Sequence, residues 1–350
     1  MIIDLPTTTT ETINRTMIEL RDSGGAVALG RVMTLVIVTD DADAEHAIEA
    51  ANDASREHPC RVLVLVRGAR SGAPRLDAQI RVGGDAGASE VIVLRMYGDL
   101  ADHGESVAVP MLLPDAPIVT WWPGRAPTSA FADPVGAIAQ RRITDSAASA
   151  DPIAALDQLR ASHHAGDTDL AWSRVTAWRA LLAAALDQPP FDPVTSVRVA
   201  GAADSPSTDL LAGWLALMLR CTVVRSQISE GTGMHSVRLE RASGAIDLVR
   251  PDGDVATLTQ PGQPERRISL PRRADRECLA EELRRLDPDD VFGEVLGEGL
   301  SLITRSGTVE VQRPSVSERA AGAVRRAAEM ATRATTSQRE RAAAAAEGPA

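Results

Sequence analysis

The sequence predicts an α/β protein: an N-terminal domain built on a mostly parallel sheet, followed by a second α/β (α+β) domain, with a helical segment between them. Apolar runs in the first half are nearly continuous, which is typical of strands buried on both faces of a parallel sheet. These runs alternate with helical patterns, as in βαβ units. Apolar residues make up 44% of the 350 residues, enough for two hydrophobic cores.

The first half alternates expected strands and helices. A helical pattern at 13–21 precedes four apolar strands, which are expected at 32–38 (VMTLVIV), 61–66 (RVLVLV), 90–94 (EVIVL) and 118–122 (IVTWW). The helix between the first two strands begins after three aspartates and ends before Pro59. Another helical stretch leads to Pro114.

From Asp151 the pattern becomes helical. Asp151 and Pro152 mark the start of one helix, and 169–186 predicts a long helix capped by Asp167 or Thr168. The second unit then follows, with expected strands at 197–200 and 221–225, a helix at 206–219, antiparallel strands between 237 and 268, and helices at 273–286 and 288–296. Asp287 is the expected cap of the last helix.

These patterns predict five segments. They are an N-terminal helical extension (1–26), an N-terminal α/β domain (27–150), a helical connector (151–190), a C-terminal α/β domain (191–312) and a solvated tail rich in Ala, Arg and Glu (313–350). The tail has no apolar stripe, so we expect it to be a solvated helix or a frayed end.

Charge and cysteine usage exclude several classes of function. The net charge is −11, and the seven Arg and four Glu of the tail give it +3, which leaves −14 on residues 1–312. An acidic body disfavours binding to nucleic acid or to an anionic membrane. No signal peptide is evident, and no apolar run approaches the roughly 20 residues that span a bilayer. Three isolated cysteines predict a reduced, cytoplasmic protein.

No motif in the sequence predicts catalysis, a cofactor or a metal site. The glycine-rich run Gly83 to Gly87 lacks the Lys and Ser/Thr of a phosphate-binding loop, so a plain turn is the simpler interpretation. Asp40, Asp41 and Asp43 follow a buried strand, where α/β folds commonly bind ligands. Capping of the next helix and attraction to its dipole explain these aspartates more simply.

Tryptophan and arginine mark the candidate partner surface, because both are enriched at binding hot spots. The candidate partner-binding residues are Trp121, Trp122, Trp172, Arg174, Trp178 and Arg179. The alternative is that the rings fill the cleft between the domains, with the arginines paired to carboxylates such as Glu294 or Glu298. Adjacent strand residues point to opposite faces, so Trp121 and Trp122 are both buried only if both faces are covered.

Three blocks, in order, resemble the glucose-6-phosphate dehydrogenase assembly protein (OpcA) family: 112–124 (LLPDAPIVTWWPG), 169–187 (DLAWSRVTAWRALLAAALD) and 290–301 (DVFGEVLGEGLS). The resemblance extends over about residues 30–305. It implies a non-catalytic partner that promotes assembly or activation of glucose-6-phosphate dehydrogenase, with no catalytic residues to transfer. Self-association is left open.

The fold class alone leaves an alternative function: an enzyme or sensor that binds a sugar phosphate or nucleotide near Asp40–Asp43 or Gly83–Gly87.

Overall fold

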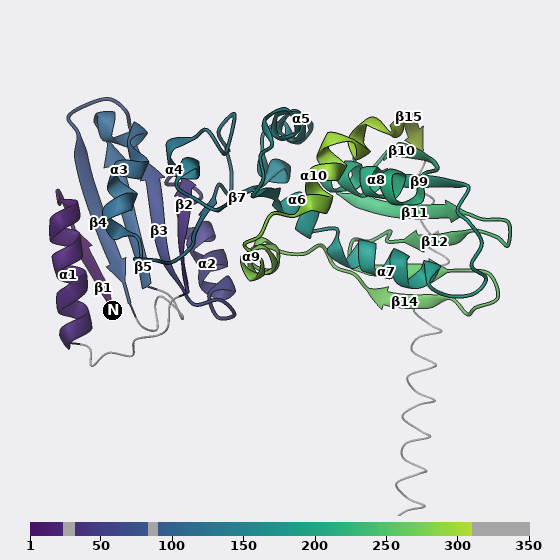
Figure 1. The fold of residues 1–350 in the computed structure, drawn as a ribbon, viewed down its shortest axis with the longest axis horizontal. Helices are drawn as coiled ribbons and strands as arrows, with labels where there is room; N and C mark the ends of the chain where they lie inside the picture. Colours follow the sequence, from purple (N-terminus) through teal and green to yellow (C-terminus); the bar gives the residue numbers. More distant parts are fainter. Residues whose placement is uncertain (24–31, 83–89, 310–350) are drawn as a thin grey trace, which may run out of the picture. The chain divides into compact units, whose positions relative to one another are not determined.

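Two sheets organise the chain in this computed structural model, which describes residues 1–23, 32–82 and 90–309 (Figure 1). The first sheet has the strand order β1-β4-β5-β3-β2-β6-β7-β8, and the second has the order β14-β13-β12-β11-β9-β10-β15. The predicted α/β class is therefore confirmed. The predictions for Gly83 to Gly87 and for the tail at 313–350 lie outside the described residues.

The eight-stranded sheet is parallel from β5 to β8, and β4 and β1 extend it antiparallel at one edge. Its strands are β1 (Ile2–Leu5), β2 (Met33–Thr39), β3 (Cys60–Arg67), β4 (Arg75–Arg81), β5 (Glu90–Tyr97), β6 (Ile118–Trp121), β7 (Arg141–Thr144) and β8 (Asp167–Asp169). Strands β2, β3, β5 and β6 lie where the sequence predicts strands.

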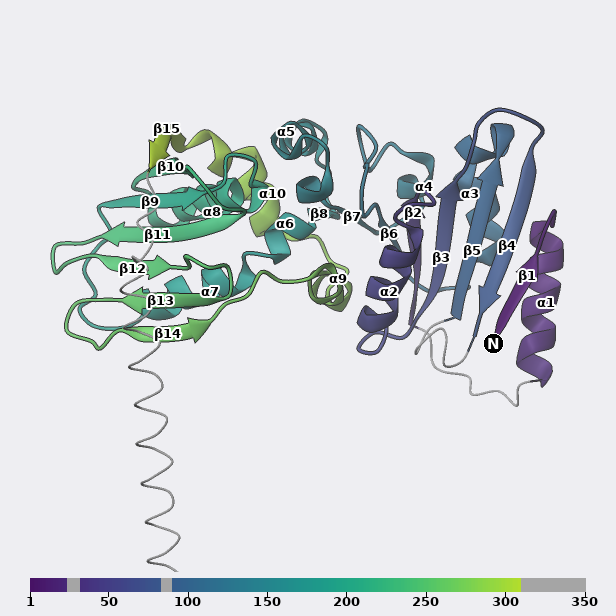
Figure 2. The same cartoon turned by 180° about the vertical axis from the view of Figure 1, so that it is seen from behind.

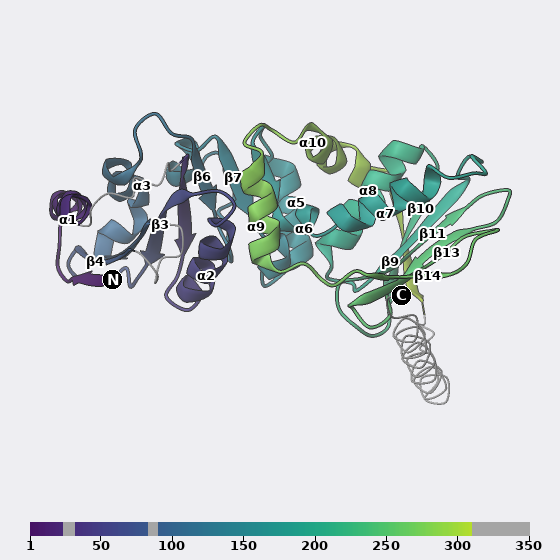
Figure 3. The ribbon, with the colours of Figure 1, turned by 90° about the horizontal axis from the view of Figure 1, so that it is seen from below.

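Helices cover both faces of this sheet. One face packs against α2 (Ala44–Ala54) and α9 (Asp275–Arg284), and the other packs against α1 (Thr10–Ser23), α3 (Gly104–Ala108) and α4 (Pro134–Ala137). Figure 3 shows α2 and α3 on opposite sides of β3. Cover on both sides explains why β2 and β3 are buried along nearly their whole length.

Helix α9 follows most of the second sheet in the chain, yet it packs against α2 beside the first sheet. Its buried side chains Cys278, Leu279 and Leu283 join the core between α2 and the strands. Two contacts reinforce this packing at the surface: His46 Nε2 lies 3.2 Å from Asp275 Oδ2, and Arg284 lies 3.2 Å from Glu57. The first sheet therefore depends on residues from late in the sequence.

The predicted long helix at 169–186 is interrupted. After α5 (Pro152–Ser162), Asp167 and Thr168 belong to β8, so the prediction that either one caps the helix was wrong. Asp169 is the cap, because its side chain accepts the N–H of Ala171, and two helices follow: α6 (Leu170–Ser173) and α7 (Thr176–Leu186). Pairing of β8 with β7 takes up the two predicted caps and Asp169, and the helix itself is interrupted at Arg174 and Val175.

The seven-stranded sheet is mixed. Strands β9, β10 and β15 are parallel, while β9, β11, β12, β13 and β14 run antiparallel, as expected for residues 237–268. The bounds are β9 (Ser196–Gly201), β10 (Thr222–Ile228), β11 (Met234–Glu240), β12 (Ile246–Val249), β13 (Val255–Thr259), β14 (Arg266–Ser269) and β15 (Ile303–Val309).

Helices cover one face of this second sheet: α7, α8 (Pro206–Leu219) and α10 (Asp290–Gly297) share its core. Helix α10 begins later than predicted, because the cap is Asp289, which accepts the N–H of Phe292 at 2.9 Å, and not Asp287. In Figure 2 the strands lie in front of these helices, and no helix of the described chain covers the opposite face.

Candidate functional site

The aspartates after β2 lie at the carboxyl edge of the parallel strands, where α/β folds place ligands. Asp40 Oδ1 accepts the N–H groups of Ala42 (3.0 Å) and Asp43 (3.2 Å), and Asp41 Oδ1 accepts from Arg95 at 3.1 Å. Asp43 occupies the N-cap position of α2, but its side chain makes no cap hydrogen bond. The expected side-chain cap is therefore replaced by a turn that Asp40 closes ahead of the helix.

A cavity of about 620 Å³ adjoins this edge and includes Asp40 and Asp43 in its lining. Two of its arginines are already paired, Arg67 with Asp133 (3.6 Å) and Arg70 with Asp102 (2.8 Å). The carboxylates of Asp40 and Asp43 lie near the start of α2. In a dinucleotide-binding fold, glycine N–H groups at this position bind the phosphate. Asp40 and Asp43 repel a phosphate at the start of α2 itself, while Arg67, Arg70 and Arg125 also line the cavity.

Among the described residues, no three His, Cys, Asp or Glu side chains gather as a metal-ligand set. Within the same ranges, no helix is both long enough and apolar enough to cross a membrane.

A buried polar network joins the end of β7 to the start of α6. The fully buried carboxylate of Asp169 accepts four hydrogen bonds: from the N–H of Ala171 (2.9 Å), the N–H of Ser146 (2.8 Å), the Ser146 hydroxyl (2.9 Å) and the Thr144 hydroxyl (2.7 Å). These bonds offset the cost of burying its charge. The network fixes the turn that leads into the tryptophan-bearing helices.

Arg174 lies in the short break between α6 and α7 and binds two carboxylates. Its terminal nitrogens donate to Asp145 in a bidentate pair (2.7 and 2.6 Å), and one of them also donates to Asp275 Oδ1 at 2.6 Å. Burial alone would lower the pKa of Arg174, but the hydrogen bonds and charge of Asp145 outweigh it, so the pKa is raised. The guanidinium is thus a charged, internally paired group that ties β7 to α9.

Arg179 and the indoles of α6 and α7 lie together inside the fold. The Arg179 guanidinium stacks on the Trp172 ring, 3.6 Å from its centroid, and donates to the Thr176 hydroxyl at 3.0 Å. The Trp172 indole N–H donates to Asp289 at 2.8 Å, and Trp178 is 1% exposed in the core of the second sheet. The carboxylates that pair with Arg174 are Asp145 and Asp275, rather than Glu294 or Glu298.

Trp121 and Trp122 are separated from that group and from each other. Trp121 packs in the core on the α2 face of the first sheet, and Trp122 packs on the α3 face. Both are fully buried, which confirms that the alternation along the strand sends the rings to opposite, covered faces. All four candidate tryptophans are core residues in this structure, and contact with a partner stays a prediction.

Two protein-family models match the chain. One describes the N-terminal domain of a glucose-6-phosphate dehydrogenase subunit and matches residues 51–161, and the other describes the C-terminal domain of that subunit and matches residues 165–296. The chain belongs to the OpcA family. The resemblance carried by the three sequence blocks is thereby confirmed, and the family descriptions point to an assembly or subunit role.

The comparison with solved structures finds oxidoreductases at low identity and with TM-scores below 0.5. A 3-ketoreductase from Actinomadura kijaniata with NADP is 10% identical (79% of this chain, 99% of that chain, TM-score 0.40). A glucose-6-phosphate 1-dehydrogenase from Mycobacterium avium is 11% identical (79% and 94%, TM-score 0.35). A Gfo/Idh/MocA family oxidoreductase from Vibrio cholerae is 11% identical (77% and 95%, TM-score 0.34). No curated protein matches the chain.

In this OpcA-family chain, the face of the seven-stranded sheet that none of the described helices covers is a surface that sequence reasoning missed. We call it the open face; it comprises Arg198, Val224, Ser236, Arg238, Asp247, Val249, Thr257, Thr259, Arg267 and Thr304. All of these side chains are half-buried or exposed, while their neighbours in sequence on β9, β11 and β13 are buried against the helices. The alternation of polar and apolar residues in β11 and β13 was the available signal.

Proposed function

We propose that this OpcA-family protein is a non-catalytic partner that binds glucose-6-phosphate dehydrogenase and favours its active, assembled state. The observation that carries the proposal is the match of the two family models across residues 51–161 and 165–296. Three free cysteines support a cytoplasmic location.

The mechanism follows from thermodynamic linkage. A partner that binds the active form of an enzyme more tightly than the inactive form shifts the equilibrium between them by that difference in binding free energy. A tenfold activation requires about 1.4 kcal/mol of differential binding. One or two side chains at the centre of an interface supply that much.

We infer that the open face is where the dehydrogenase docks. Seven hydrogen-bonded strands form a rigid platform, so little ordering entropy is lost when a partner binds to it. Arg198 and Arg267 project from this face without an ion-pair partner in the described chain, whereas Arg238 is held by Glu240 (2.5 Å) and Asp247 (2.8 Å). The two unpaired guanidiniums are available to carboxylates of a partner.

The test mixes the purified chain with its dehydrogenase and follows NADP⁺ reduction and elution volume. We expect a faster rate and a larger particle. In the variant with Arg198→Glu and Arg267→Glu, like charges face the partner's carboxylates, so both effects should weaken at least tenfold. Arg285→Glu, at an exposed position after α9, is the matched control and should behave as the unmodified chain.

Two results would count against these proposals. If neither the rate nor the particle size changes with the unmodified chain, the assembly role is wrong. If both change, but the double variant is as effective as the control, the role stands and the docking face lies elsewhere.

A further inference from the structure

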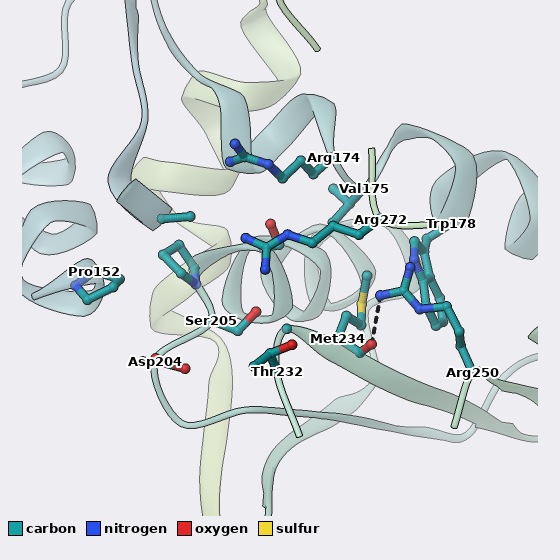
Figure 4. A pocket seen from close by; sticks show the side chains of 14 residues that line it. Pro152, Arg174, Val175, Trp178, Asp204, Ser205, Thr232, Met234, Arg250 and Arg272 are labelled. Atoms are coloured by element: carbon teal, nitrogen blue, oxygen red, sulfur yellow. Dashed lines mark hydrogen bonds between the residues drawn. The ribbon is translucent and has the colours of Figure 1, made fainter. Parts of the chain in front are cut away.

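A small cavity lies where the second sheet meets the start of α8. It has a volume of about 140 Å³ and is lined by the side chains of Arg174, Trp178, Ser205, Thr232, Arg250 and Arg272, among others. Figure 4 shows Ser205, Thr232, Arg250 and Arg272 around the same space. These residues come from the loop before α8, the β10–β11 turn and the segments after β12 and β14.

Two of the three guanidiniums, those of Arg250 and Arg272, form no ion pair with any carboxylate of the described residues. Arg174 is neutralised by Asp145 and Asp275. Arg250 is only 6% exposed, and its terminal nitrogens donate to the backbone carbonyls of Leu270 and Met234, both at 2.9 Å. Its Nε has no hydrogen-bond partner among the described residues. Arg272 is exposed and forms no ion pair in the described chain.

The surroundings of Arg250 favour a negative charge. Burial and then the positive charge of Arg272 lower the pKa of Arg250, against an opposing effect of Asp254. Two cations that face the same space repel each other until an anion lies between them. One carboxylate, that of Asp204, also lines the cavity, and it reduces the positive charge without pairing with either arginine.

The neutral polar groups that line the cavity also favour binding of an anion. Ser205 is the N-cap of α8, a helix of 14 residues, whose positive dipole end faces the cavity wall. The hydroxyl of Thr232 lies close by (Figure 4). The volume is well below the roughly 300–1,000 Å³ of sites for larger ligands, so the cavity suits one tetrahedral anion and the first atoms attached to it.

We propose that this cavity binds the phosphoryl group of a small phosphate monoester. Arg250 and Arg272 supply the charge, the dipole at the start of α8 adds to it, and the Ser205 and Thr232 hydroxyls supply hydrogen-bond donors. The body of the ligand extends toward solvent on the side of Arg272. This cavity is a different site from the one near Asp40 and Asp43, which lies at the first sheet.

The test measures thermal unfolding and binding heat of the isolated full-length chain with inorganic phosphate and with glucose 6-phosphate as probes. We expect a saturable rise in Tm with either probe that sodium chloride at equal ionic strength does not produce. Tighter binding of glucose 6-phosphate than of inorganic phosphate would show that the ester, and not the free anion, is the ligand. Equal affinities would overturn the monoester assignment.

Arg272→Ala is the decisive variant, because this exposed side chain has no partner whose loss would unfold the protein. We expect at least tenfold weaker binding of both probes. Arg266→Ala, an exposed arginine on β14, should bind as the unmodified chain does. A Tm that does not respond to phosphate, or unchanged binding in Arg272→Ala, would overturn the proposal. The assay needs no dehydrogenase, so its failure leaves the proposed assembly role intact.

Discussion

The two sheets of this protein differ in how much of each is covered. The first is enclosed by α2 and α9 on one face and by α1, α3 and α4 on the other, whereas the second packs against helices on a single face. The described helices therefore cover both faces of the first sheet, and its central strands β2, β3 and β5 are nearly continuous apolar runs. The second keeps a row of Ser, Thr, Val and Arg side chains in water. This difference separates a sheet enclosed by helices from a sheet with one face of polar and half-buried side chains.

The largest expected effect on stability comes from comparing one buried and one solvent-facing aspartate substitution, one on each sheet. Val64→Asp on β3 buries a carboxylate without a partner, because Val64 is 0% exposed, so we expect a loss of at least about 4 kcal/mol and an insoluble chain. Val224→Asp on the open face lies beside Arg198 in register and in contact with water, and should cost less than about 1 kcal/mol. Urea unfolding measures both. Equal stability of the two variants would contradict the comparison.

The next effect compares two ion pairs. Arg174→Ala leaves the buried carboxylate of Asp145 unpaired, so we expect a loss of about 3–5 kcal/mol. Arg238→Ala breaks a half-exposed pair on the open face and should cost at most about 1 kcal/mol. Denaturant titrations of both variants measure the difference. If Arg174→Ala is as stable as Arg238→Ala and weakens only binding to the dehydrogenase, Arg174 belongs to the interface, as the sequence alone suggested.

A smaller effect concerns pH at the contact between α9 and the rest of the fold. Burial alone would raise the pKa of Asp275, but Arg174 and His46 outweigh it and lower the pKa below its usual 3.8. A lowered folded-state pKa adds stability above the unfolded value, and this stability is lost as pH falls through the folded value. Asp275→Asn should therefore destabilise the chain more at pH 6 than at pH 3. An equal loss at both pH values would show that the carboxylate charge contributes nothing.

The smallest expected effect is a difference in the chemical reactivity of the cysteine thiols, measured on the folded chain. Burial raises the pKa of Cys278 to about 12, so its thiol stays protonated at neutral pH. Cys221 is half-buried, and burial also raises its pKa, though less. At pH 8 we expect slow labelling of Cys221 by a thiol reagent, with Cys60 and Cys278 labelled only after unfolding. Mass spectrometry locates each label, and rapid labelling of Cys278 in the folded chain would be the contrary result.

Local sequence signals predicted the elements whose causes are local. Asp151 with Pro152, and Pro206 after Ser205, begin α5 and α8 as expected, because a capping side chain and a proline act within one helical turn. Strand β7 was missed because its sequence RRIT carries two arginines. Arg141 pairs with Glu282 on α9 and Arg142 pairs with Asp167 on β8, and such distant partners leave no local trace.

The candidate site was harder to predict for the same reason. Tryptophan and arginine side by side on α6 and α7 have the composition of an interface, yet carboxylates 29 and 101 residues away in the chain bind Arg174 inside the fold. The open face and the small arginine-lined cavity depend on how the strands of the second sheet pair and which face each side chain takes, and the helices that cover one face come from other parts of the chain. Only the folded chain brings Arg250 and Arg272 together.

The return of α9 to the first sheet limits how this chain can be divided. A fragment that stops at residue 190 would lack the three apolar side chains that close one side of α2, and it would present that strip to solvent. Expressed alone, such a half should aggregate, and adding α9 as a separate peptide should restore its solubility. Gene fusions or truncations that divide the chain between the two sheets would therefore separate α9 from the first sheet, against which it packs.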